Sequence, residues 1–153
     1  MVSGVLDQRV RQRSLEVIRR LPIPRPFDLE RFRVALERRR ERTLRFIPAR
    51  TATGTAGGPD GLWVATANAD HIFYDQDATP LRQLHIIARE IGHMVLEHQG
   101  APASISEIAR LLLPALDPAL IISTLGRTSY TGAEEQEADL FAALLLDHME
   151  TAS

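Results

Sequence analysis

Residues 85–98 read HIIAREIGHMVLEH, and they belong to a longer segment in which apolar side chains recur at steps of three and four residues. That period is typical of an α-helix that buries one face. Thr79 followed by Pro80 is a helix cap with proline at the first helical position, so the sequence predicts that the helix begins there. The buried stripe consists of Leu81, Leu84, Ala88, Ile91 and Val95.

A neighbouring face of the same helix carries ionisable side chains. His85, Arg89 and His93 follow one another at steps of four, so they lie on successive turns, and Glu90 lies beside them. Gly92 in mid-helix costs about 1 kcal/mol relative to alanine, which is tolerable where another backbone packs close to that turn. Taken alone, Glu-x-x-His has a plain interpretation: His93 lies at the edge of the core, and Glu90 pairs with a neighbouring arginine.

A second helix is predicted near the C-terminus. Thr131 and Glu134 have the spacing of a capping box, so the helix should begin there and run to about His148. Glu135 and Asp139 follow one turn apart, just before the apolar run FAALLL. Their acidic neighbours Glu134 and Glu137 are explained by favourable placement near the positive N-terminus of a helix.

The remaining segments predict an α+β fold. It has an N-terminal helical arm, a small antiparallel sheet of about three strands, and a helical half that contains the two helices above. The arm has two helices, at 7–20 and 29–42, separated by the proline-rich LPIPRPF and with Asp28 as the cap of the second. The strands are 42–49, 62–66 and 71–74, the last two forming a hairpin, and two further helices are predicted at 104–113 and 117–125.

Length and composition fit one domain, residues 1–153, with a basic arm (1–42) and a core (43–153). The chain has no cysteine, so any metal must be held by His, Asp or Glu. No apolar run is long enough for a membrane span and the N-terminus lacks the apolar core of a signal peptide, so we expect a cytoplasmic protein with no membrane partner.

Charge divides the chain into a basic and an acidic part. Residues 1–50 hold 14 arginines against 6 acids, a balance of +8, whereas residues 51–153 hold 4 arginines against 14 acids, a balance of −10. A basic arm can bind DNA, contact an acidic protein, or pack on its own acidic half. No recognition-helix or aromatic-stacking pattern accompanies the arginines, which argues against DNA.

The two chemical segments, REIGHMVLEH (89–98) and EEQEADLFAALLL (134–146), together resemble the ImmA/IrrE family of zinc peptidase-like proteins. The pattern of that family is a His-Glu-x-x-His helix and a later helix with Glu-x-x-Ala-Asn/Asp-x-Phe-Ala. The resemblance covers about residues 43–148, including GLWVATANADHIFYD and GRTSY. It is closest to short members described as toxin-like or regulator components.

The resemblance implies a zincin-like pair of helices and a role for each matching residue. His93 would be a zinc ligand, Glu135 the third ligand, and Glu90 the general base that activates a metal-bound water. Asp139 would orient a ligating imidazole. Tyr130 is an auxiliary candidate for stabilising an oxyanion, although a structural role suits it better.

The chain departs from the pattern at the first ligand, where Arg89 stands in place of histidine. A guanidinium offers no lone pair to a metal, and its charge repels the ion. Loss of one ligand removes several kcal/mol from a binding free energy on the order of 10 kcal/mol, so zinc would be weakly bound or absent. His85 is a candidate substitute ligand, but it lies a full turn, about 5.4 Å, before Arg89, too far to replace the lost ligand without moving the site. His71 and His98 are further candidate donors.

An alternative hypothesis needs no metal: Arg89 takes the place of the cation and pairs with Glu135, and also with Glu90. Whether the chain is an enzyme is therefore open. The favoured function is a degenerate metallopeptidase-like regulatory or toxin-antitoxin-type protein that acts by binding a protein partner. The alternative is an active zinc-dependent endopeptidase that cleaves a regulator or repressor, with Glu90 as its base.

Overall fold

The computed structural model describes residues 2–49, 61–66, 68–98, 101–102 and 125–151. Of residues 2–7, 101–102 and 125–129 only the backbone is described. The helices are α1 (Val2–Arg20), α2 (Leu29–Arg40), α3 (Pro80–Val95) and α6 (Gly132–Thr151). The strands are β1 (Thr43–Ala49), β2 (Gly61–Ala65), β3 (Ala69–Asp75), β4 (Ala101–Pro102) and β5 (Leu125–Ser129).

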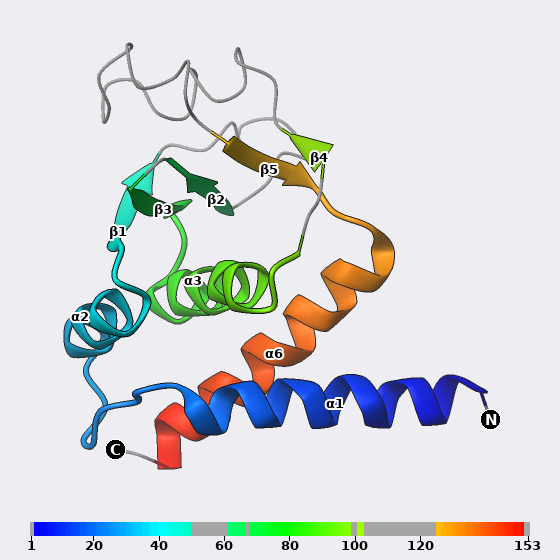
Figure 1. Ribbon diagram of the computed structural model, residues 1–153. Coiled ribbons are helices and arrows are strands. Elements are labelled where there is room, and N and C mark those ends of the chain that lie inside the picture. The colour runs from blue at the N-terminus through cyan, green and yellow to red at the C-terminus, as the bar shows by residue number, and fades with distance from the viewer. Residues whose placement is uncertain (1, 50–60, 67, 99–100, 103–124, 152–153) are drawn as a thin grey trace.

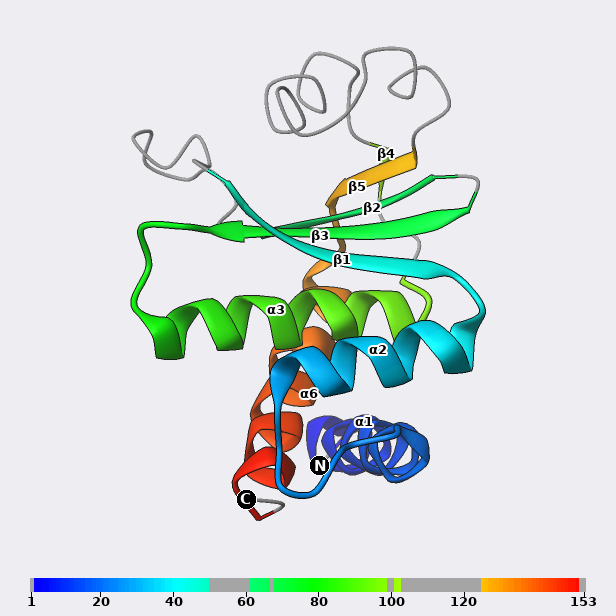
Figure 2. The same cartoon turned by 90° about the vertical axis from the view of Figure 1, so that its left-hand side faces the viewer.

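The helices of these residues lie on one side of a single sheet (Figures 1 and 2). α3 runs beneath the sheet with α2 alongside it, α6 crosses under α3, and α1 packs across α6 on the side away from the sheet (Figure 2). The core lies between these layers, where Phe32, Ile72, Ile91 and Phe141 are fully buried. The α+β class with an N-terminal helical arm is confirmed.

The sheet differs from the predicted one in the direction of one strand pairing and in having two additional strands, β4 and β5. Its strand order is β1-β3-β2-β5-β4. The hairpin of β2 and β3 is antiparallel as predicted, but β1 pairs with β3 in parallel, from Thr43 opposite Ala69 to Ala49 opposite Asp75. The sheet is therefore mixed, and the expectation of a wholly antiparallel sheet is corrected. β4 and β5 were not predicted.

Side-chain caps fix the helix starts as the sequence indicated. The Asp28 carboxylate accepts from the Arg31 amide at 2.8 Å, and the Thr79 hydroxyl accepts from the Arg82 amide. Thr131 and Glu134 form the predicted reciprocal capping box at the start of α6. The predicted helix 104–113 lies outside the described residues, as does 117–125 apart from its last residue, which begins β5.

The basic arm packs on the rest of its own chain. α1 packs across α6, and the Arg13 guanidinium donates to the Leu96 carbonyl at 2.9 Å and lies 3.4 Å from the Glu137 carboxylate. α2 packs under β1, the neighbouring strand in sequence. Of the roles open to the arm, packing on its own acidic half is therefore observed, and it engages only part of the arginines.

A buried carboxylate ties the end of the arm to the hairpin. Asp70 on β3 accepts from Arg42 Nε at 3.0 Å, from Arg40 Nη2 at 3.3 Å and from Trp63 Nε1 at 3.0 Å. Arg42 also donates to the carbonyls of Thr66 and Ala69. The Asp70 side chain is 2% exposed and each of the two arginine side chains is 28% exposed, so removing the carboxylate charge leaves two partly buried positive charges together.

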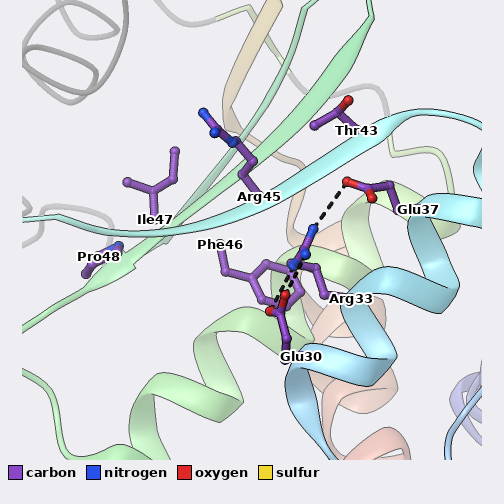
Figure 3. A pocket seen from close by; sticks show the side chains of 8 residues that line it. All are labelled: Glu30, Arg33, Glu37, Thr43, Arg45, Phe46, Ile47 and Pro48. Carbon is purple, nitrogen blue, oxygen red and sulfur yellow. Dashed lines mark hydrogen bonds and ion pairs between the residues drawn. The ribbon is translucent and has the colours of Figure 1, made fainter.

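The outer edge of β1 is partly closed by side chains of α2. Arg33 donates to the Leu44 carbonyl at 2.8 Å, and Glu37 accepts from the Leu44 amide at 2.9 Å, so the pair imitates a neighbouring strand. Figure 3 shows the open groove of about 560 Å³ between α2 and this edge, with Phe46 beneath Arg33. Pro48 has no N–H to offer there, and such devices protect an edge strand from pairing with other chains.

We expect Asp70→Asn to lower the free energy of unfolding by about 3 kcal/mol, because the substitution leaves Arg40 and Arg42 without their buried counter-charge. Urea unfolding followed by circular dichroism measures the change. The matched control is Asp147→Asn, an exposed aspartate on α6, which should stay within about 0.5 kcal/mol of wild type. Equal stability of the two variants would contradict the role given to Asp70.

Candidate functional site

The site forms where α3 crosses α6, and a glycine sets their distance. A Cβ atom added to Gly92 would lie 2.9 Å from Phe141 Cδ1, too close for the ring to remain where it is. The sequence suggested close packing of another backbone at this turn. The structure instead places an aromatic ring of α6 there, and that contact brings the polar faces of the two helices together.

His93 and Glu135 meet across this crossing, as the family resemblance implied. His93 Nε2 lies 3.4 Å from Glu135 Oε1. The His93 side chain is 1% exposed and that of Glu135 is 41% exposed, so the pair spans from the interior to the surface. The Tyr130 ring stacks on the His93 ring with centroids 3.7 Å apart and planes 9° from parallel. Tyr130 thus holds the imidazole in place, which is a structural role and not the stabilisation of an oxyanion.

The other nitrogen of His93 faces a second histidine. His93 Nδ1 lies 2.8 Å from His98 Nδ1, and His98 Nε2 lies 2.6 Å from Glu137 Oε1. Glu137 in turn faces Arg13 of the arm. In any hydrogen bond between two Nδ1 atoms one ring donates and the other accepts, so the tautomers of the two histidines are coupled.

The backbone after α3 explains how His98 reaches His93. The helix ends at Val95, and Glu97 adopts the left-handed conformation with φ 58°. This turns the chain back so that the His98 amide donates to the His93 carbonyl at 3.0 Å. Helical spacing of five residues would place the two rings on different faces, so periodicity gave no signal for this contact. Glu137, which the sequence explained by helix polarity alone, is the partner that was missed.

Burial keeps His93 neutral. Desolvation lowers its pKa from the ordinary value to about 3, with smaller contributions from His98 and from the positive charge of Arg89. A neutral imidazole on a buried wall presents one donor and one acceptor nitrogen.

Arg89 lies on the same edge of α3, one turn before His93. Its Nη1 lies 3.8 Å from Asp139 Oδ1, and the side chains are 18% and 56% exposed. The hypothesis paired Arg89 with Glu135; the structure also brings Arg89 beside Asp139, which lies one turn further along α6, and Glu135 faces His93. Asp139, expected to orient an imidazole, here faces a guanidinium.

The remaining candidates lie apart from the crossing. Glu90 is buried against the start of β2, where its Cγ would be 3.2 Å from a Cβ added to Gly61. His85 lines a shallow pocket with Thr79, Leu81, Arg82 and Leu146, toward the other end of α3. His71 is buried on β3 and stacks on Phe73. Burial and then the charge of Arg45 lower the pKa of His71.

The donor set at the crossing does not fit a catalytic zinc. Such a zinc takes three protein ligands and one water. His93 Nε2 and Glu135 would supply two, and Arg89 offers a positive charge where the third is required. His98 cannot complete the set as placed, because its two nitrogens face His93 and Glu137. Within the part of the chain that the structure describes, no three His, Asp or Glu side chains converge on one point.

Comparison with known proteins adds no family to this geometry. No protein-family model, curated protein or solved structure matches the chain. Among the helices of the described residues, none is both long and apolar enough to cross a membrane.

We expect the buried His93 to make stability depend on pH. Its pKa is about 3 in the folded chain and about 6.5 in the unfolded chain, so below pH 6.5 only the unfolded chain takes up this proton. The free energy of unfolding should therefore fall as pH falls, by about 3 kcal/mol at pH 4.5 from this group.

Urea unfolding at pH 7.0 and pH 4.5 measures that dependence. His93→Gln should show a smaller loss between the two values than wild type. The control His148→Gln, a half-buried histidine near the end of α6, should keep the wild-type loss. Parallel losses in wild type and His93→Gln would contradict the neutral, buried state of His93.

Proposed function

We propose that this chain is a degenerate metallopeptidase-like protein that acts by binding a regulatory protein partner, as a toxin-antitoxin-type or transcription-regulating component. One observation supports this most: on the edge of α3 that faces α6, the position of a first metal ligand holds Arg89, and its guanidinium lies 3.8 Å from Asp139. The cationic group at the crossing is part of the chain. The proposal includes a cytoplasmic location, which the lack of cysteine favours.

The charge of Arg89 opposes a second cation at this place. The guanidinium stays protonated at any physiological pH and has no lone pair, so it adds repulsion and no bond. The charge of Arg89 already disfavours a proton on His93, as the lowered pKa of that imidazole indicates. A doubly charged ion bound to the same imidazole would meet the same repulsion more strongly.

The crossing retains features that suit a recognition surface. The buried side is rigid, because His93 is held by the Tyr130 ring and by His98. The outer side presents Glu135 and Asp139, about half exposed, beside Arg89. These side chains can bind a partner through hydrogen bonds and ion pairs, and no catalysed reaction is required.

The alternative function is an active zinc-dependent endopeptidase that cleaves a regulator or repressor. The observation in its favour is that His93 Nε2 and Glu135 Oε1 already face each other at 3.4 Å. Bound zinc would supply a Lewis acid and an activated water. His93 and Glu135 would hold it, and Glu90 would have to act as base. The buried position of Glu90 against β2 is a further difficulty for that role.

Zinc content distinguishes the two functions. Wild-type protein purified without chelator and dialysed against micromolar zinc should hold much less than one zinc per chain, measured by plasma mass spectrometry. Arg89→His should hold close to one, because it adds the third ligand and removes the charge. The control Arg82→His places a histidine two turns earlier on α3 and should behave as wild type. About one zinc per wild-type chain would overturn the proposal.

Proteolysis provides a second test. Protein N-termini are compared by mass spectrometry in cells that express wild type or Glu90→Gln at equal levels. The binding function predicts the same set of N-termini in both. A set of new N-termini that occurs with wild type and disappears with Glu90→Gln would establish the endopeptidase in its place.

A further inference from the structure

A second surface, apart from the helix crossing, follows α1, α2 and the segment 21–28 that joins them, which we call the elbow. We name it the arginine face and define it by seven exposed arginines: Arg9, Arg11, Arg19, Arg20, Arg25, Arg31 and Arg38. In the part of the chain that the structure describes, none of the seven guanidinium groups forms an ion pair. Their charge is therefore not neutralised within the fold.

The arginines that hold the arm to the core are other residues. Arg13 binds Glu137 and Leu96, Arg33 binds Glu30 and Leu44, and Arg40 and Arg42 bind Asp70. Exposed acids in the same segment are fewer, namely Glu16, Asp28, Glu30 and Glu41, and Glu30 is already paired with Arg33 at 2.5 Å. The packing function of the arm thus leaves most of its positive charge in solvent.

The seven arginines lie on adjoining parts of the molecule. Figure 1 shows α1 and α2 joined by the elbow at one corner, away from β4 and β5. Arg31 and Arg38 are seven residues apart on α2, so both point outward from the same face of that helix. α1 alone has 19 residues and a length of roughly 28 Å.

We propose that the arginine face binds the phosphate backbone of double-stranded nucleic acid without reading its sequence. Duplex DNA has one negative charge for about every 1.7 Å of its axis, and the planar guanidinium pairs with phosphate through two hydrogen bonds. Exposed arginines of α1 and α2 together give this surface a positive charge that complements such a polymer.

The rest of this surface excludes other occupants. The described part of the arginine face has no large exposed hydrophobic side chain and presents far more arginines than acids, so a protein bound there would meet one sign of charge and no apolar centre. Single-stranded nucleic acid is held by exposed aromatic rings on which the bases stack, and the arginine face has none. The partner that fits the arginine face is therefore one bound through its charge. The arginine face offers no pattern of side chains that reads bases, so the binding would not depend on sequence.

The test is fluorescence anisotropy with a labelled 24-base-pair duplex of arbitrary sequence between 50 and 200 mM NaCl. We expect a dissociation constant of about 10⁻⁵ M at 100 mM NaCl and a slope of about −4 in log affinity against log salt. Arg31→Ala with Arg38→Ala should weaken binding about tenfold at 100 mM and make the slope shallower by about 2. Circular dichroism and Trp63 fluorescence verify that the variant is folded.

The control removes the same charge elsewhere. Arg45→Ala with Arg82→Ala changes β1 and α3, and Figure 3 shows that Arg45 points away from α2; this variant should bind the duplex within twofold of wild type. No binding at 50 mM, or equal losses in both double variants, would overturn the proposal. Polyglutamate or a single strand of equal charge bound as tightly as the duplex would also overturn it, because the surface would then attract any polyanion.

Discussion

The contact between Gly92 on α3 and the Phe141 ring on α6 is the constraint on which the polar site depends. Because α3 has no side chain of its own at Gly92, the Phe141 ring packs directly on that turn, and α6 approaches α3 closely enough for His93 to meet Glu135 and for Arg89 to meet Asp139. The same approach places Glu137 against His98 and within reach of Arg13. One close packing contact thus links the sheet layer, the crossing and the arm.

A buried neutral histidine and a fixed guanidinium give this crossing its electrostatic character. Burial removes the charge from His93, so the formal charges that face one another are Arg89 on α3 and carboxylates on α6. The chain itself supplies both the cation of this pair, Arg89, and its counter-charge, Asp139. Its stability comes from the apolar packing around it, since partly exposed ion pairs contribute at most about 1 kcal/mol each.

Much of this fold could be predicted from local sequence signals, because caps and hydrophobic periods act within one helix. Thr79, Asp28 and Thr131 each marked a helix start correctly, whereas the helical period wrongly placed Leu81 in the buried stripe of α3, since its side chain is 73% exposed. The proximity of His93 and Glu135 was implied by the family resemblance and not by their spacing. The parallel pairing of β1 with β3 could not be predicted, since alternation of side chains is the same in parallel and antiparallel strands. β5 has no apolar alternation of its own and depends on β2 as its template.

The contacts within the site could not be predicted from the sequence, because they depend on tertiary packing and on one backbone turn. His98 reaches His93 only because Glu97 takes a left-handed backbone conformation, and that turn is not visible in a helical pattern. That Arg89 lies beside Asp139 depends on how the helices cross, which is a property of the tertiary packing. The charge balance of the arm was evident from the sequence, but the division between its paired and exposed arginines required the structure.

The central claim is that Arg89 occupies the place of a metal ion at the crossing of α3 and α6. It is tested most directly by a crystal structure grown in the presence of zinc and recorded with X-rays at the zinc absorption edge. The account predicts density for the Arg89 guanidinium beside Asp139 and no anomalous peak within bonding distance of His93 Nε2. An anomalous peak shared by His93 and Glu135, with the Arg89 side chain turned into solvent, would contradict it.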